Sequence, residues 1–437
     1  MRDVSVMSYD QTGAARTLKL GSSFRRMSVR QRRDYLASNL NIPEEEAKSL
    51  ARDTDLADLA NVMVESSVGY MTVPMGIAAG FVVNGAKVNV PLAVEEPSVV
   101  AAATHAGSLI ARRGGGFHVE TDESVMCAEV YLEDARIPDD NGAALEEAVR
   151  NVLEEPLSGM TARGGGFRGM DLERLDERYI AVRLYIDTRD AMGANLLNTA
   201  AEAIREPALR HLGGDVNMAI LTNAAETRTA EARFALPVEF CARAHRDGEE
   251  MAKRIVSANR IANLDYHRAV THNKGIMNGI TSLALATAND TRAIEAACHA
   301  YAARSGKYRA LTEYEVHDGR LHGRLRLPLA FGTVGGATGF HPASRFALRV
   351  LGNPDSRRLA GIAASVGLAQ NFAAISALTG EGIQRGHMRL HANRLAWQAG
   401  ARGTEIPATA HYISEDGRFN HQTAARALER VRREGGG

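Results

Sequence analysis

An apolar stretch from Thr72 to Val94 is interrupted at Asn84-Gly85, and this pattern predicts two strands joined in a hairpin. Asn-Gly between two such segments favours a tight turn, because both residues accept a left-handed backbone. A second hairpin is predicted over Leu311–Leu329, with its turn at Asp318-Gly319. Two further strands are predicted, over Val125–Leu132 and Tyr179–Asp187.

Longer segments of the chain are typical of helices. These predicted helical segments are Ala143–Leu153, Asn195–Leu212, Ala242–Arg304, Ser356–Leu378, a helix ending at Ala399 and Thr423–Arg433. Gly114-Gly115-Gly116 indicates a domain boundary, and strands alternate with helices from there to about Thr222. We therefore expect one large domain from residues 1–116 and 223–380, a small inserted domain at 117–222 and a C-terminal segment at 381–437.

Composition narrows the class of protein. The 437 residues carry 52 basic and 52 acidic side chains, so no surface for nucleic acid is indicated. Three widely spaced cysteines, Cys127, Cys241 and Cys298, form neither a disulfide framework nor a zinc motif. No uninterrupted apolar run approaches the length of a membrane span, and the N-terminus lacks the apolar core of a signal peptide. We expect a soluble, cytoplasmic protein.

The segment Thr271–Gly279 places a lysine, Lys274, among amide, imidazole and glycine groups. Lysine is rare in this chain, and most of its basic residues are arginine. A lysine ammonium is a compact charge whose pKa responds to burial, and it suits a reaction that builds negative charge on a carbonyl oxygen. A solvated surface lysine is the alternative interpretation of this segment taken alone.

Asp190-Ala191-Met192-Gly193-Ala194-Asn195 stands where a predicted strand leads into a predicted helix. Gly193 permits close approach of a ligand, and Asn195 is a candidate N-cap whose helix could bind a phosphate. Ordinary capping explains the same residues. Gly164–Gly169 matches a dinucleotide-binding glycine pattern, but it does not lie between a first strand and a helix, so we do not interpret it as a Rossmann motif.

Other polar motifs have plain structural interpretations beside functional ones. Glu95-Glu96 ends a predicted strand, where only one of two neighbouring side chains can face a site. His387 and His391 share a helix face, but the glutamate of a zinc-protease motif is missing after His387. Asn289-Asp290 is typical of a helix boundary, and Gly332–Gly336 of a turn after a strand, to which we assign no chemistry.

Together these ordered segments, from about residue 60 to 402, resemble 3-hydroxy-3-methylglutaryl-coenzyme A (HMG-CoA) reductase in its soluble, prokaryotic class II form. The resemblance implies an α+β fold: a large mixed domain for substrate, a small inserted non-Rossmann cofactor domain and a C-terminal helical flap. It implies reduction of HMG-CoA to mevalonate and CoA with two NADH or NADPH and no metal, or the reverse oxidation. It also implies a homodimer or higher oligomer with active sites at the subunit interface, and no nucleic-acid or membrane partner.

The resemblance also implies roles for single residues. Lys274 would stabilise the oxyanion, Glu96 would supply a proton, Asp290 would hydrogen-bond Lys274, and His387 would protonate the departing CoA thiolate. The implied substrate-binding residues are Glu65, Ser98, Arg268, which would bind the free carboxylate, and Asn278. The implied cofactor-binding residues are Asp190, Met192, Gly193, Asn195 and Asn223.

The chain departs from the family pattern in two places. Glu65-Ser66-Ser67-Val68-Gly69 stands where the family has Glu-Asn-Val-Ile-Gly, so an amide donor is lost. No aspartate lies between Asn151 and Arg163 to bond a ribose hydroxyl, although Glu154 or Glu155 could reach it, so NAD and NADP both stay open. Two other functions are weighed against the reductase: an inactive CoA- or nucleotide-binding protein of the same fold, and a metal-dependent hydrolase using His387 and His391.

Overall fold

The computed structural model describes the following parts of the chain: residues 18, 20, 24, 27, 29–48, 59, 63, 70–243, 245–380, 382 and 384–434, without the side chains of residues 29, 48 and 384–390. Strands β1 (Met75–Val83) and β2 (Ala86–Ala93) form an antiparallel hairpin. Both turn residues are left-handed, with φ 46° at Asn84 and φ 77° at Gly85. The first predicted hairpin is therefore confirmed, with its turn at the predicted residues.

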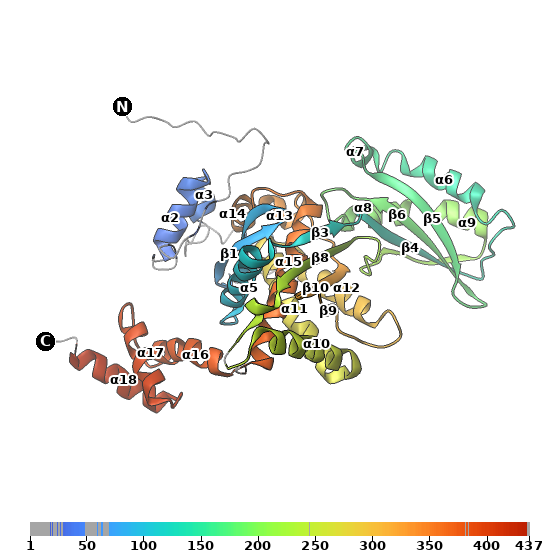
Figure 1. Ribbon diagram of the computed structural model, residues 1–437. Helices are drawn as coiled ribbons and strands as arrows, with labels where there is room; N and C mark the ends of the chain where they lie inside the picture. The colour runs from blue at the N-terminus through green and yellow to red at the C-terminus, as the bar shows by residue number, and fades with distance from the viewer. Residues whose placement is uncertain are drawn as a thin grey trace.

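Helix α15 (Ser356–Thr379) runs through the middle of the protein (Figure 1). It is packed by α5 (Val99–Gly114), α10 (Gly248–Leu264) and α11 (Tyr266–Ala286). A Cβ atom added to Gly367 would lie 2.8 Å from Ile280, so the glycine permits α11 to approach α15 closely. Among the described residues, α15 is also the one helix long and apolar enough to cross a membrane. Its most apolar window is 89% buried inside the protein, as in the core helix of a globular domain.

A four-stranded antiparallel sheet packs one face against these helices. Its order is β3 (His118–Thr121), β8 (Thr229–Pro237), β10 (Arg320–Pro328) and β9 (Thr312–His317). Phe234 and Tyr314 point into the core, whereas the neighbouring Arg233 and Arg324 lie on the outer, charged face. This alternation is expected for an antiparallel sheet that is solvated on one side. The second predicted hairpin, turning at Asp318-Gly319, is confirmed by β9 and β10.

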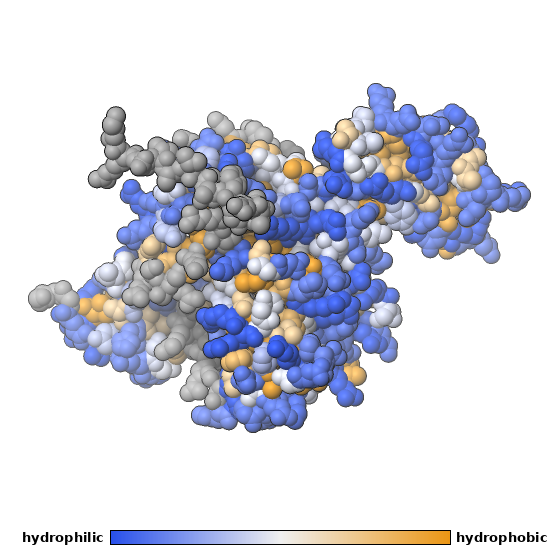
Figure 2. Space-filling model, turned by 45° about the horizontal axis from the view of Figure 1, so that its top comes forward, coloured by the Kyte–Doolittle hydropathy of each residue, from blue (hydrophilic) through white to orange (hydrophobic). Residues whose placement is uncertain are grey.

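A second four-stranded antiparallel sheet forms a lobe that projects from the rest of the protein (Figures 1 and 2). Its order is β5 (Gly166–Arg174), β6 (Tyr179–Asp187), β4 (Val125–Glu133) and β7 (Asp215–Leu221). It has a hydrophobic cluster of its own, which includes residues from the helices α6 (Ala143–Leu153), α8 (Ala194–Ala203) and α9 (Arg205–Leu212). The helix predicted over Asn195–Leu212 is in fact two, because the chain breaks at Ile204.

The remaining described elements cover the ends of the chain and the edges of the core. Three C-terminal helices pack on one another around a small apolar cluster. The predicted tail helices are found there, and one that was not predicted, α17, lies between them. The elements at the ends of the chain and at the edges of the core, the three C-terminal helices included, are α2 (Val29–Asn39), α3 (Glu44–Lys48), α7 (Ser158–Thr161), η2 (Val238–Cys241), α12 (Thr291–Ala303), α13 (Gly336–Phe340), α14 (Pro342–Val350), α16 (Gln384–Gln398), α17 (Glu405–Asp416) and α18 (His421–Glu434).

Candidate active site

Lys274 and Glu96 meet between α11 and the end of β2. Asp265 begins α11, accepting hydrogen bonds from the backbone of His267 and Arg268. Lys274 lies in the third turn, and its Nζ is 2.8 Å from Oε2 of Glu96. The Lys274 side chain is 60% exposed and that of Glu96 is 35% exposed. Within a single chain the pair therefore stands at the surface, where a ligand can reach it.

The backbone beside Glu96 is strained. Ser98 has φ 79°, in the left-handed region that a serine rarely adopts, and its side chain caps none of the first NH groups of α5. Such strain costs about 1–3 kcal/mol and is concentrated at functional sites. Ser98, two residues after Glu96 in the chain, therefore combines a strained backbone with a hydroxyl that does not cap its own helix.

Two other predicted residues, Asn278 and Arg268, also belong to α11. Asn278 is one helical turn beyond Lys274, so the two side chains share a face of the helix. Arg268 is half-buried, and burial lowers the pKa of its guanidinium, with no opposing contribution from a carboxylate of the described residues. A half-buried cation that lacks an acidic partner in the described part of the chain is ready for an anionic ligand.

A buried polar network lies on the side of α11 away from Lys274, and the sequence did not indicate it. His272 is 1% exposed, and its Nε2 is 2.5 Å from the Thr312 hydroxyl and 3.0 Å from Nδ2 of Asn371. Burial, and then the charge of Arg268, lowers the pKa of His272 to about 3. His272 is therefore neutral at physiological pH and ties α11 to β9 and α15.

Asp290 lies away from Lys274 in the single chain. It is the N-cap of α12 and accepts hydrogen bonds from the backbone NH groups of Arg292 and Ala293. Twelve residues separate Lys274 from Ala286 at the end of α11, or about 18 Å at the rise of an α-helix. The hydrogen bond between Lys274 and Asp290 that the resemblance implies is thus not formed within one chain.

The segment Asp190–Asn195 joins the projecting sheet to α8. Asp190 accepts a hydrogen bond from the backbone NH of Ser356, at the start of α15 (3.0 Å). Gly193 is the N-cap of α8, with φ 93°, and none of the described side chains caps the helix. The prediction of Asn195 as N-cap is therefore wrong, because it is the second residue of the helix. The first NH groups of α8 are left to a ligand or to water.

A buried arginine braces the same segment, although no motif singled it out. Arg228 is 5% exposed, and Nη1 donates to the Thr188 hydroxyl and to the carbonyl of Ala191, both at 3.0 Å. Its Nη2 donates to the carbonyl of Phe331 at 2.5 Å. Burial lowers the pKa of its guanidinium to about 10, so the group keeps its charge at neutral pH.

The other predicted residues have varied positions. Met192 is partly buried beside Gly332, and Asn223 is exposed just after β7. His387 lies within α16, but its side chain is outside the described ones, as is the whole of Glu65. Among the described side chains, no three His, Cys, Asp or Glu groups are placed to hold a metal ion.

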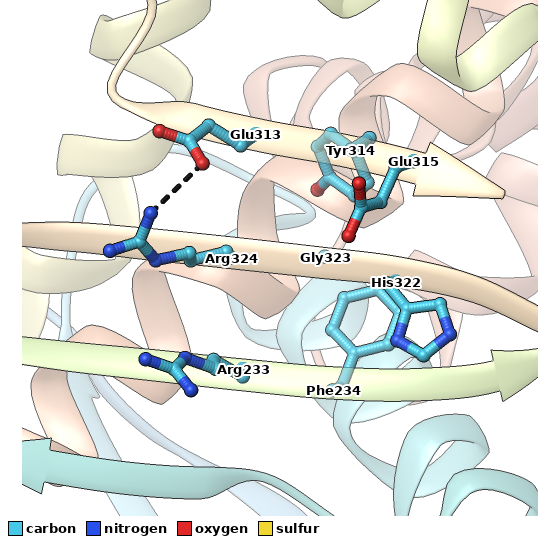
Figure 3. A pocket seen from close by; sticks show the side chains of 8 residues that line it. All are labelled: Arg233, Phe234, Glu313, Tyr314, Glu315, His322, Gly323 and Arg324. Atoms are coloured by element: carbon cyan, nitrogen blue, oxygen red, sulfur yellow. Dashed lines mark hydrogen bonds and ion pairs between the residues drawn. The ribbon is translucent and has the colours of Figure 1, made fainter. Parts of the chain in front are cut away.

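A depression of about 470 Å³ lies elsewhere, on the outer face of the sheet that contains β8, β9 and β10 (Figure 3). Arg324 donates there to Glu313 (3.0 Å) and to the buried Glu231 (2.7 Å). Both arginines of the depression, Arg233 and Arg324, are thus already paired with carboxylates, and we assign the depression no chemistry. The lining residues include none of those predicted from the sequence: Arg233, Phe234, Glu313, Tyr314, Glu315, His322, Gly323 and Arg324.

Comparison with known proteins identifies the family of the chain. A family model described as hydroxymethylglutaryl-coenzyme A reductase matches residues 28–392. The HMG-CoA reductase of Archaeoglobus fulgidus is 39% identical, over 94% of both chains. A probable HMG-CoA reductase of Borreliella burgdorferi is 36% identical, over 86% of this chain and 87% of its own.

Solved structures agree with this result. An HMG-CoA reductase from Streptococcus pneumoniae superposes with a TM-score of 0.77 at 35% identity, over 94% of this chain and 99% of its own. A second structure, described as the class II enzyme of that organism bound to NADPH in open conformations, has a TM-score of 0.76 at 36% identity. It covers 93% of this chain and 100% of its own. By sequence and by fold, the chain belongs to the hydroxymethylglutaryl-coenzyme A reductase family, in its prokaryotic class II form.

Proposed function

We propose that Lys274 and Glu96 form the reacting centre at which this chain reduces HMG-CoA to mevalonate and CoA. The observation that carries the proposal is the 2.8 Å pair between Nζ of Lys274 and Oε2 of Glu96, on a surface that a ligand can approach. An ammonium beside a carboxylate can stabilise an oxyanion and then exchange a proton with it. The same groups serve the reverse reaction, the oxidation of mevalonate.

The thioester carbonyl gains negative charge when it receives the first hydride, and Lys274 stabilises that charge. Glu96 supplies the proton that completes the hemithioacetal. Loss of CoA leaves an aldehyde, and His387, carried on α16, protonates the departing thiolate; imidazole suits this step because its pKa is near neutrality. Lys274 then stabilises the second oxyanion as the aldehyde becomes the alcohol.

Four residues are proposed to hold the substrate. Arg268, half-buried and without an acidic partner among the described side chains, pairs with the free carboxylate of HMG-CoA. Ser98 and Asn278 flank the Lys274–Glu96 pair and orient the carbonyl, while Glu65 is assigned by resemblance alone.

Two molecules of reduced nicotinamide dinucleotide, NADH or NADPH, would supply the two hydrides, one each. We propose that Asp190, Met192, Gly193, Asn195 and Asn223 hold the dinucleotide. The uncapped N-terminus of α8 suits this assignment, because a helix N-terminus attracts phosphate and Gly193 leaves the approach open. Its relative from Streptococcus pneumoniae is described as bound to NADPH, which favours the phosphorylated cofactor.

We further propose that two copies of the chain share each active site. Lys274 is exposed in one chain, where its Nζ pairs with Glu96 and Asp290 instead caps α12, beyond the end of α11, so Asp290 of a second copy would complete the centre. We place the inserted dinucleotide-binding domain at residues 117–222 and the enzyme in the cytoplasm. A larger homo-oligomer is compatible with the same shared site.

The test is oxidation of NADH and of NADPH, in parallel, by the purified protein with HMG-CoA and without added metal. Substrate-dependent oxidation supports the reductase, and the ratio of the two rates selects the cofactor. Absence of oxidation with both cofactors and of the reverse reaction, in a folded sample, would refute the proposal and favour a protein that only binds CoA or nucleotide.

A further inference from the structure

The segment Gly332-Thr333-Val334 connects two parts of the proposed active site. On one side it contacts Asn289, the neighbour of Asp290. On its other side it contacts Asp190, in the segment proposed to bind the dinucleotide. This glycine-rich turn, to which its motif alone assigned no chemistry, is thus the physical link between the two.

Asn289 binds this link through a reciprocal pair of hydrogen bonds. Its Nδ2 donates to the carbonyl of Gly332 (3.1 Å), and the NH of Gly332 donates to its Oδ1 (2.7 Å). Nδ2 also donates to the Thr287 hydroxyl (2.9 Å), which fixes the amide at the end of α11. An amide held at both its oxygen and its nitrogen has one orientation only.

The link is equally tight against the dinucleotide segment. The NH of Thr333 donates to the carbonyl of Asp190 (2.8 Å), and Val334 forms a parallel bridge with Ala191. A Cβ atom on Gly332 would lie 2.7 Å from the backbone nitrogen of Met192, so no side chain fits between them. Any displacement of Gly332 is therefore passed directly to Met192.

The buried Arg228 holds the Gly332 segment and the dinucleotide segment together. Its guanidinium joins the carbonyls of Ala191 and Phe331, the two residues that flank the contact between Met192 and Gly332. A buried cation that binds two carbonyls holds the two segments at a fixed separation.

We propose that Asn289 is a positioning residue for hydride transfer: through Gly332 it sets the position of the dinucleotide segment relative to Asp290. This inference rests on the proposed function. Hydride transfer depends steeply on the distance between the reacting atoms. A small shift of the dinucleotide should therefore lower the rate of that step strongly, while the stability of the fold changes little.

The experiment compares wild type with Asn289→Ala and with the nearly isosteric Asn289→Asp, which keeps only the acceptor for Gly332. We expect kcat/KM for the dinucleotide to fall by roughly tenfold or more in Asn289→Ala and by less in Asn289→Asp. KM for HMG-CoA stays unchanged. The primary kinetic isotope effect, measured with dinucleotide deuterated at the transferred position, increases because hydride transfer becomes slower than product release.

A matched control is Asn84→Gly. Asn84 forms the same reciprocal pair with the backbone of Val119, in the β1–β2 turn, and glycine accepts its left-handed backbone. This variant loses two similar hydrogen bonds but should keep the wild-type isotope effect. An isotope effect is unaffected by the fraction of folded enzyme, so a purely structural role of Asn289 would leave it unchanged.

Wild-type kinetics and isotope effect in both Asn289 variants would overturn the inference and leave the proposed function intact. Gly332→Ala, in which a methyl group is forced against Met192, should reproduce the effect of Asn289→Ala, and a wild-type isotope effect there would count against the link. Failure of the wild-type protein to oxidise either cofactor with HMG-CoA would instead refute the proposed function.

Discussion

Replacing Lys274 by alanine separates its part in catalysis from its part in stability. The side chain makes an ion pair with Glu96, and the two side chains are 60% and 35% exposed. Pairs at such exposure contribute about 0–1 kcal/mol, because water and salt screen the charges. Alanine is also a good helix former. We therefore expect the free energy of unfolding of Lys274→Ala to differ from wild type by less than about 1 kcal/mol.

The expected loss of activity is much larger. A preorganised donor to a developing oxyanion contributes roughly 10²- to 10³-fold to kcat, and here the same ammonium is used at both hydride steps. The assay is the HMG-CoA-dependent loss of reduced nicotinamide absorbance, with denaturant unfolding of the same sample. Lys253→Ala is the control: its Nζ is 2.7 Å from Glu249 on an exposed helix face, so it removes a similar pair. Near-normal rates in Lys274→Ala, or equal losses in both variants, would refute the assignment.

Three further results are expected. Glu96→Gln keeps the side-chain volume but removes the proposed proton donor. Turnover should therefore fall while the free energy of unfolding stays unchanged, and a normal rate would exclude Glu96 as the proton donor. Arg268→Ala should raise KM for HMG-CoA but not for the dinucleotide, and equal changes in both would argue against carboxylate binding. The pKa of His272 is about 3 in the folded chain against an ordinary 6.5, so only the unfolded chain binds this proton between those values. The free energy of unfolding should therefore fall as pH drops from 6.5 towards 3, by about 1.4 kcal/mol per unit at most, and an unchanged pH slope in His272→Gln would disprove it.

Local signals predicted the elements that depend on local chemistry. Asn84-Gly85 predicted the first hairpin because both residues accept φ above zero, and Asp318-Gly319 predicted the second in the same way. The long alanine-rich helix was predicted as Ser356–Leu378 and ends one residue later. The family resemblance rests on equally local motifs, such as the segment around Lys274, so it requires no knowledge of which distant segments meet.

Contacts between distant segments left no such signal. Arg228 carries no motif, and its partners Thr188 and Phe331 are 40 and 103 residues away. Asn289 and Gly332 are separated by 43 residues, so each appeared to be an ordinary boundary residue. The cap of α8 was misassigned because propensity favours asparagine over glycine as an N-cap, whereas the sharp entry from β6 requires φ 93°.

The exposure of Lys274 has a physical consequence for the assembly. An oxyanion is stabilised strongly only where water is excluded, yet this ammonium is 60% exposed in one chain. The beginning of α11 and the end of α10 also expose apolar side chains, Leu264 at 77% and Tyr266 at 61%. If a second copy covered these side chains together with the Lys274–Glu96 pair, it would exclude water from the pair and could bring its own Asp290 to the ammonium. One interface would thus exclude water from the site and supply its missing carboxylate. For this reason we propose a dimer with shared active sites and not a dimer in which each chain has a complete site of its own.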